Sequence, residues 1–397
     1  MTKITRRSVL SSLVGLAAAP FVAHDAIAQP RRRRQRELAA EARGPSIFAA
    51  VDRTMHAILN ELKIAGGSIA ISHRGQSVLR RGYGLADVQR QLPVKPDTLF
   101  STASVTKPFT AIGVLKLVGE GRLALDAPIV EVLKDLAPLP GQQIADPRFR
   151  QVTVHQLLYH AGGFPHDVSV QMPTTSGEPG DDLSEEKAVR MYRKALGLPL
   201  EFDPGSTHKY SNFGFVVLRL VIEHAAGQPY EPYIQEQVLR PMGIERMRME
   251  QSGDYLPNET HRYREGGQQP AVRQAANWLA PATALARFAS MVAGSGGGTP
   301  FLGPRLTQQM LALPPGVQPN RNGGHVGLGW DRAEQLATGF QFSKNGGKGG
   351  VRAWLEHLPY EVDWAVLYNT NPPDKHDVLG ETRKRLLPIF ERKFAGR

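Results

Sequence analysis

Cysteine is absent from the 397 residues of this sequence. Disulfides, a thiolate nucleophile and cysteine-ligated zinc or iron–sulfur clusters are therefore excluded. The absence is compatible with an oxidising compartment but does not demonstrate one. Three further patterns are missing: the Gly-x-Ser-x-Gly turn of α/β-hydrolases, a Walker phosphate-binding loop and the His-Glu-x-x-His zinc pair. These absences disfavour the three kinds of enzyme that depend on those patterns.

Long uncharged apolar runs are lacking after the N-terminal region, so a later membrane span is not expected. The N-terminus has the parts of an export signal: adjacent Arg6 and Arg7, a short apolar stretch, and small residues at 26–28. The paired arginines resemble a twin-arginine signal, which implies export in the folded state. An ordinary secretory leader is the alternative. We expect residues 1–28 to be the signal and the mature, periplasmic or extracellular protein to begin near Gln29.

Acidic residues are fewer than basic ones, 37 against 48, which gives a formal net charge of +11. Part of this excess is local, in the run from Arg31 to Arg34. A basic surface can attract nucleic acid or an anionic envelope polymer. No zinc-finger pattern or aromatic-basic interleaving indicates a nucleic-acid partner. We therefore expect a solvated, flexible basic lead-in over residues 29–43, no nucleic-acid partner, and at most weak contact with envelope polymers.

Hydrophobic periodicity places strands near both chain ends and helices between them. Residues about 101–300 alternate helical patterns with Pro- and Gly-rich loops, and strand patterns are scarce there. The clearest patterns are a helix at 47–62, a hairpin at 67–83, helices at 104–118 and 213–226, strands at 351–355 and 364–368, and a closing helix at 379–394. We predict one domain over residues 44–397, in which a sheet assembled from both ends carries a mostly helical insertion.

Three short motifs follow one another: Ser104-Val105-Thr106-Lys107, Tyr210-Ser211-Asn212 and Lys344-Asn345-Gly346. None is specific alone, because Ser184 to Lys187 also matches Ser-x-x-Lys; that match follows two aspartates, as at the capped, exposed start of a helix. Ser104 instead stands where an extended segment turns into an apolar helix, whose first N–H groups are available to an anion. Lys107 lies one turn on, where burial would favour its neutral form, and a neighbouring base is what serine needs to become a nucleophile.

As an ordered set these motifs resemble the class C β-lactamase and penicillin-binding-protein family, which also includes D,D-peptidases, D-aminopeptidases and family VIII-type esterases. The resemblance covers about residues 47–395. It is carried by residues 100–110, 203–205, 210–212 and 344–350, and by secondary matches at 153–163, 241–243 and 327–330. It implies a β-lactamase/transpeptidase-like fold of the α/β class, with an antiparallel sheet flanked by helices.

The resemblance implies a nucleophile and its bases. Ser104 would attack the substrate, and Lys107 and Tyr210 would jointly accept its proton. Tyr210 would later assist the leaving group and the deacylating water. No cofactor and no metal are expected. Without the other two motifs, a tyrosine such as Tyr210 would more often be a half-buried packing residue.

The resemblance also implies binding roles. Asn212 would hydrogen-bond the acyl side of the substrate, and the backbone N–H groups of Ser104 and Gly347 would form the oxyanion hole. Lys344, Asn345 and Gly346 would contact the substrate, with the Lys344 ammonium suited to a carboxylate. Two alternatives stay open: Asn212 as a helix cap, and Lys344 as electrostatic support for the bases. We interpret His160, which stands at a family-like position, as structural.

Three departures from the family pattern place the substrate in doubt more than the mechanism. Asn345 stands where lactamases typically have threonine, residues 277–279 replace commonly paired glycines, and Arg352 follows in a strand that usually offers a small residue. The favoured prediction is an exported serine hydrolase acting on a β-lactam or a D-amino-acid peptide. The alternatives are a carboxylesterase on small esters and a catalytically weak envelope-binding protein. Fold alone does not decide among them.

Overall fold

The computed structural model describes residues 46–395 apart from gaps at 137, 139–140, 142, 166–184, 252, 272–276, 320–323 and 338. The predicted signal, the lead-in over 29–43 and Ser184 lie outside the described residues. The chain divides into two units, residues 1–49 and 50–397. The sheet and the site lie in the second. Within the described part of the chain, no helix has the length and apolar character that crossing a membrane requires.

The strands and helices have the following bounds. The strands are β1 Gly66–His73, β2 Gln76–Asp87, β3 Leu92–Pro93, β4 Phe100–Ser101, β5 Arg248–Met249, β6 Trp278–Ala280, β7 His325–Gly327, β8 Trp330–Leu336, β9 Gly339–Lys348, β10 Val351–Leu358 and β11 Val362–Tyr368. The α-helices are α2 Ile47–Glu61, α3 Thr106–Gly119, α4 Ile129–Val132, α5 Val154–Leu158, α7 Glu185–Leu196, α8 Asn212–Ala226, α9 Tyr230–Ile234, α10 Ala282–Ala293, α11 Gly303–Leu311 and α12 Val378–Phe390.

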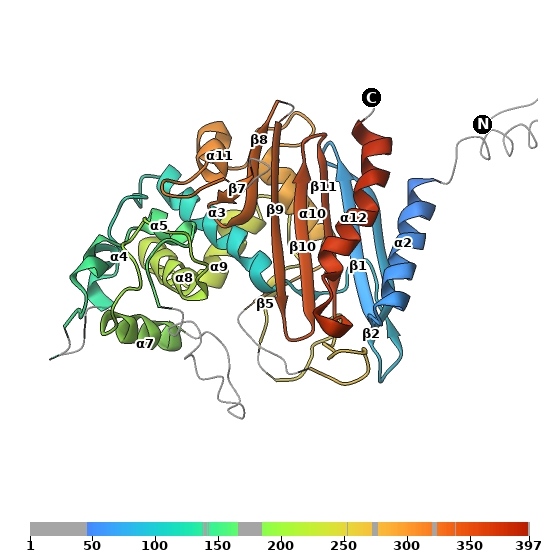
Figure 1. The fold of residues 1–397 in the computed structure, drawn as a ribbon, viewed down its shortest axis with the longest axis horizontal. Helices are drawn as coiled ribbons and strands as arrows, with labels where there is room; N and C mark the ends of the chain where they lie inside the picture. Colours follow the sequence, from blue (N-terminus) through green and yellow to red (C-terminus); the bar gives the residue numbers. More distant parts are fainter. Residues whose placement is uncertain are drawn as a thin grey trace, which may run out of the picture. The chain divides into compact units, whose positions relative to one another are not determined.

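Eight strands form one sheet in the order β3-β2-β1-β11-β10-β9-β8-β7, and its ladders are antiparallel. The first and last long strands lie side by side, with Gly67 opposite Tyr368 and His73 opposite Val362 (Figure 1). The predicted antiparallel sheet built from both chain ends is therefore confirmed. A small second sheet, β4-β6-β5, connects the segment before α3 to the middle of the chain.

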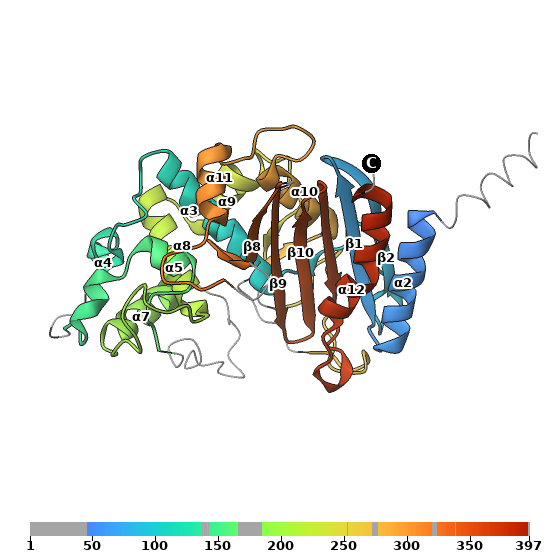
Figure 2. The same cartoon turned by 45° about the horizontal axis from the view of Figure 1, so that its top comes forward.

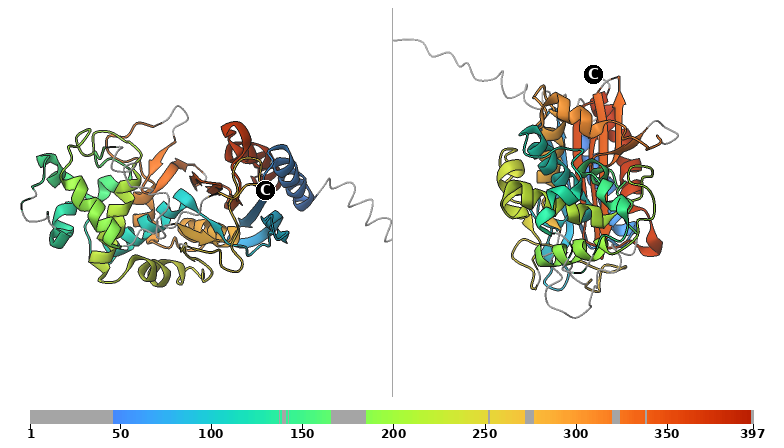
Figure 3. Two further views of the ribbon diagram at one scale, coloured as in Figure 1. Left: turned by 90° about the horizontal axis from the view of Figure 1, so that it is seen from below. Right: turned by 90° about the vertical axis from the view of Figure 1, so that its left-hand side faces the viewer.

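Helices cover both faces of the large sheet, and all seven residues of β11 are buried for that reason. Trp364 packs its ring on Phe390 of α12, and the Tyr368 hydroxyl lies 2.8 Å from Thr382 Oγ1 of the same helix. The alternate residues, Ala365 and Leu367, belong to the core cluster that includes α10. Successive side chains of a strand point to opposite faces, so α12 and α10 lie on opposite sides of the sheet, as Figure 3 shows.

The inserted region is helical, as predicted, and gathers beside the β7–β9 end of the sheet (Figure 2). Its central helix, α8, contacts α3, α4, α5, α7 and α9. Because it is surrounded, α8 is apolar around most of its circumference, with nine buried residues from Phe213 to Ile222. It ends at Gly227, whose φ of 65° is the left-handed conformation that closes many helices.

Two predicted boundaries and several strands differ from the structure. The helix expected from residue 104 starts as a short 3₁₀ turn, η1 (Ala103–Val105), before α3. The closing helix stops at Phe390 and continues as a π-helical turn over Glu391–Ala395. Sequence periodicity also missed β7, β8 and β9. Strand β9 is the clearest case, because its second half, Ser343–Lys348, has the glycine and polar composition of a loop.

Candidate active site

Ser104 lies in η1, in a strained connection between β4 and α3. The preceding residue, Ala103, has a φ of 45°, which a side chain with Cβ rarely adopts. The turn is held from outside: the N–H and the hydroxyl of Thr102 both donate to the carbonyl of Trp278 in β6, each at 2.9 Å. Strain of this kind persists only where surrounding contacts over-determine it. The small sheet thus sets the orientation of Ser104.

Lys107 lies in the first turn of α3 and is buried, with 7% of its surface exposed. Its Nζ lies 3.3 Å from Ser104 Oγ and donates to Asn212 Oδ1 at 2.8 Å. Burial, which is the largest cause, and the nearby charge of Lys344 together lower the pKa of Lys107 to about 7, and Asp331 opposes the shift. Near neutral pH a substantial fraction of this amine is therefore unprotonated.

Tyr210 comes from the segment before α8 and meets the same serine. Its hydroxyl donates to Ser104 Oγ at 2.7 Å. The residue as a whole exposes 41% of its surface, but its hydroxyl points inward to the serine. Burial raises the pKa of Tyr210 to about 12, against the lowering effect of the hydrogen bond to Ser104. The phenol therefore keeps its proton at neutral pH, and Lys107 is the group whose proton affinity suits a base there.

The imidazole ring of His160 packs against the ring of Tyr210. Its ring centroid lies 4.4 Å from that of Tyr210, and its Nδ1 lies 3.2 Å from both the backbone N and the backbone O of Ser211. Burial holds the pKa of His160 well below its usual range, and the charges of Lys107 and Lys344 add to this effect. A neutral, buried imidazole at this place packs and orients Tyr210, which agrees with a structural role.

Asn212 is the first residue of α8. The helix cap is supplied instead by Ser211, whose Oγ accepts the N–H of Gly214 at 3.1 Å. With the cap filled by its neighbour, the Asn212 side chain is directed to the amine of Lys107. The Tyr-Ser-Asn motif therefore carries a phenol for the serine, a cap for the helix and an oxygen for the lysine.

Lys344 is almost wholly buried within β9, with 1% of its surface exposed. Its ammonium lies 5.2 Å from the centroid of the Tyr210 ring and forms an ion pair with Asp331 of β8. Burial lowers the pKa of Lys344, and Asp331 opposes this shift. Asp331 also accepts the backbone N–H of Asn345 at 3.0 Å. Sequence reasoning missed Asp331, although it directly follows the family-like run at 327–330.

Gly346 is the point where β9 touches the nucleophile segment. A Cβ added there would lie 2.6 Å from Thr102 O and 2.9 Å from Ser104 N, closer than side chains approach backbone. The backbone N–H of Asn345 points to Asp331, away from β10. Alternate N–H groups along a strand point the same way, so the N–H of Gly347 is directed to that edge too. The segment that carries Ser104 lies next to this edge, against the face of β9 that Gly346 presents.

The departures from the family pattern fall in different places. Trp278 is fully buried, and its indole N–H donates to the Tyr230 hydroxyl at 3.3 Å, so it belongs to the core beneath the site. Asn345 is exposed. Arg352 pairs with Gly347 across the β9–β10 ladder and is half-buried.

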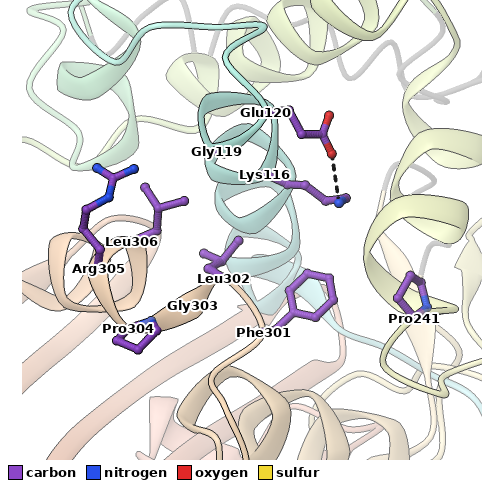
Figure 4. A pocket seen from close by; sticks show the side chains of 10 residues that line it. All are labelled: Lys116, Gly119, Glu120, Pro241, Phe301, Leu302, Gly303, Pro304, Arg305 and Leu306. Atoms are coloured by element: carbon purple, nitrogen blue, oxygen red, sulfur yellow. Dashed lines mark ion pairs between the residues drawn. The ribbon is translucent and has the colours of Figure 1, made fainter.

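One cavity adjoins these residues and another lies apart from them. One of about 410 Å³ adjoins the site and includes His208 and Asp331 in its wall. Another of about 440 Å³ lies at the far end of α3, where Figure 4 shows the ion pair of Lys116 with Glu120 facing Phe301 and Pro241. Only the first is connected to the catalytic group, through the contact of Asp331 with Lys344.

Comparisons with known proteins found a family model, curated relatives and solved structures that are similar to this chain. A protein-family model described as Beta-lactamase matches residues 51–387. Esterase EstB of Burkholderia gladioli is 34% identical over 203 residues, which are 50% of each chain, so the alignment spans about half of that relative. Two solved structures share the fold: a β-lactamase/D-alanine carboxypeptidase from Pseudomonas syringae (TM-score 0.69, 20% identity, 87% of this chain and 99% of that one) and the D-amino acid amidase of Ochrobactrum anthropi SV3 (0.69, 19%, 88% and 99%).

Proposed function

The chain belongs to the Beta-lactamase family, and on this premise we propose that it is a serine hydrolase that forms an acyl-enzyme at Ser104. One observation carries the proposal. Ser104 Oγ lies 2.7 Å from the Tyr210 hydroxyl and 3.3 Å from Lys107 Nζ. A nucleophile within reach of a proton acceptor and a proton donor is the arrangement that covalent acyl transfer needs.

In the proposed acylation step, neutral Lys107 accepts the proton of Ser104 while Oγ bonds to the substrate carbonyl carbon. The developing oxyanion is received by the backbone N–H groups of Ser104 and Gly347. The bond from carbon to the leaving group then breaks. Tyr210 donates its proton to the departing oxygen or nitrogen and is reprotonated from Lys107. Deacylation repeats these transfers with water as the nucleophile, and it restores Ser104 and releases the acid.

Asn212 and Lys344 act on Lys107 from two sides in this mechanism. The oxygen of Asn212 holds the amine beside the serine. The charge of Lys344 favours the neutral form of Lys107, while the ion pair with Asp331 limits that effect. These contacts favour electrostatic support as the role of Lys344, because its ammonium is buried and already faces a carboxylate. They also support a positioning role for Asp331.

We propose an ester or amide of an acyl group as the substrate class, with D-amino-acid peptides and β-lactams as the first compounds to test. The two structural neighbours are described as acting on D-amino-acid substrates or β-lactams. A carboxylesterase acting on small esters is the second candidate. The relative described as an esterase and the neutralised Lys344 both support it. Retention of Ser104, Lys107 and Tyr210 argues against a protein that only binds.

The proposal is tested by intact-protein mass spectrometry after exposure to penicillins, D-Ala-D-Ala peptides and short p-nitrophenyl esters. We expect a mass increase equal to the acyl group for at least one compound. Ser104→Ala should abolish both the adduct and turnover, because no other group in the arrangement can form the bond. Ser184→Ala, the control at the second Ser-x-x-Lys match, should leave both unchanged. Labelling that persists in Ser104→Ala would refute the assignment.

A further inference from the structure

Arg352 places a guanidinium beside the oxyanion hole proposed above. It lies opposite Gly347 in the β9–β10 ladder. A Cβ built on Gly347 would lie 3.2 Å from Nη1 of Arg352 and 3.5 Å from Cζ. The guanidinium therefore occupies the space that any side chain at 347 would take. The absence of a side chain at Gly347 leaves this space open to the guanidinium.

The charge of Arg352 is not neutralised within the described part of the chain. Its Nη1 donates to the carbonyl of Val351 at 2.8 Å, and no described carboxylate lies within ion-pair distance. The nearest acidic influence is Asp377, whose side chain already caps α12 by accepting the N–H of Gly380 at 3.0 Å. Burial lowers the pKa of Arg352, and the charge of Asp377 opposes this shift.

The other cations of the site are committed elsewhere. Lys344 faces Asp331, and Lys107 is held by Asn212 beside the serine. Arg352 stands on the opposite face of β9 from the η1 backbone, because Gly346 faces η1 and side chains alternate along a strand. A substrate lying along the free edge of β9 presents substituents to both faces. The substituent on the face away from η1 would meet the guanidinium of Arg352.

We infer that Arg352 forms a subsite for a carboxylate of the substrate, and that this residue, rather than Lys344, selects for an anionic compound. The inference rests on the proposed function and names the substrate class of the same site. A planar guanidinium can bind a carboxylate through two parallel hydrogen bonds, which adds geometric selectivity to the charge.

The test uses two pairs of aryl esters in which a carboxylate is replaced by a carboxamide of the same shape. One pair carries the group on the leaving phenol (3-carboxyphenyl and 3-carbamoylphenyl acetate). The other carries it on the acyl side (phenyl 4-carboxybenzoate and phenyl 4-carbamoylbenzoate). In Arg352→Gln and Arg352→Ala, kcat/KM for the acid of at least one pair should fall about ten- to hundredfold, as expected for one lost charge-assisted contact. The carboxamides should stay within about twofold.

Two controls accompany this comparison. Arg80→Ala removes one exposed positive charge from β2 of the same sheet and should leave the acid-to-amide ratio unchanged. Arg352→Lys keeps the charge and should retain part of the preference. Equal losses for acid and amide in both pairs, or no loss in either, would overturn the inference.

Failure of the proposed function is recognised separately. Turnover that survives Ser104→Ala would contradict the proposed acyl-enzyme. In that case a binding measurement would still test the carboxylate subsite. Calorimetry with the matching products needs no turnover for that judgement: 3-hydroxybenzoate against 3-hydroxybenzamide for the leaving-group side, and terephthalate against 4-carbamoylbenzoate for the acyl side. The wild-type protein should bind the compound with the added carboxylate more tightly in at least one pair, and Arg352→Gln should remove the difference. Equal affinities within both pairs in the wild-type protein would count against the subsite whatever the catalytic result.

Discussion

At the scale of single residues, the chemistry depends on how four polar groups share charge around Ser104. Lys107 is buried, so its neutral form is favoured. Tyr210 is raised in pKa and keeps its proton. Lys344 adds a positive charge, and Asp331 removes much of it. Lys107 and Tyr210 both contact Ser104, but their surroundings give them different proton affinities. One can therefore act as the proposed base and the other as the proposed acid.

We expect kcat/KM to fall as the pH drops through about 7, because protonated Lys107 cannot accept the serine proton. Lys344→Ala removes a charge that lowers the pKa of Lys107, so the pKa rises and this acid limb moves to higher pH. Kinetics from pH 5 to 9 with one neutral ester measure the shift.

Lys116→Ala, at the other end of α3, provides the control and should not move the limb. The acid and amide esters should lose rate in parallel in Lys344→Ala. An acid limb that stays in place or moves to lower pH would contradict the electrostatic role. A loss confined to the acid would return carboxylate recognition to Lys344.

At the scale of elements, the site exists because β9 approaches η1 more closely than side chains allow. Gly346 provides the contact, with Ser104 N only 2.9 Å from where its Cβ would be. Asp331 ties the same stretch of β9 to β8 through the N–H of Asn345. The small sheet holds η1 from the other direction through Thr102. The proposed oxyanion hole needs both segments, so we expect the distance between them to affect the rate of acylation.

Gly346→Ala should therefore separate β9 from η1 by forcing its methyl group against backbone atoms. We expect a loss of stability of about 1–3 kcal/mol from overpacking. The acylation rate should fall by about a hundredfold, the effect of a displacement of roughly 1 Å at a reacting group. Stopped-flow acylation and urea unfolding measure the two effects.

Gly298→Ala is the matched change at a glycine that has only ordinary contacts and no left-handed φ. It should alter neither quantity appreciably. An acylation rate in Gly346→Ala equal to that of the wild-type protein would show that the close approach is not required for catalysis.

At the scale of the whole molecule, strands from both ends of the second unit, residues 50–397, form one sheet. Strand β1 pairs with β11, and α12 is bound to the sheet through Glu356, which is fully buried and accepts from Arg383 and from the indole of Trp364. The sheet, and with it the register of β9, is complete only when the last strand has been added.

Export by the twin-arginine route remains our proposal, and the predicted signal over residues 1–28 provides the test. Replacing Arg6 and Arg7 with lysines should leave precursor in the cytoplasm, because that route reads the paired arginines. Cell fractionation with an antibody to the chain measures the distribution. Lysines in place of Arg31 and Arg32, which follow the leader, should not change it. Undiminished export of the first variant would indicate the ordinary secretory route.

Local patterns in the sequence were sufficient for much of the fold. The hairpin of β1 and β2, the helix α8 and the strands β10 and β11 were all predicted, because hydrophobic periodicity reflects which face of an element is buried. The motif order was enough to nominate Ser104, Lys107 and Tyr210. Strand β9 escaped this reasoning because its glycines and polar residues serve a contact that is distant in sequence.

What the sequence by itself determined is the identity and order of the groups that we propose to react, since these are properties of residue type and spacing. Only the tertiary structure decided what surrounds them. Asp331 joins Lys344, Asn212 turns to Lys107, and Arg352 lies over Gly347. The physical reason is that burial and charge depend on segments that meet only in the folded chain. A lysine is a base, an ion-pair partner or a substrate anchor according to what lies within a few ångströms of its nitrogen.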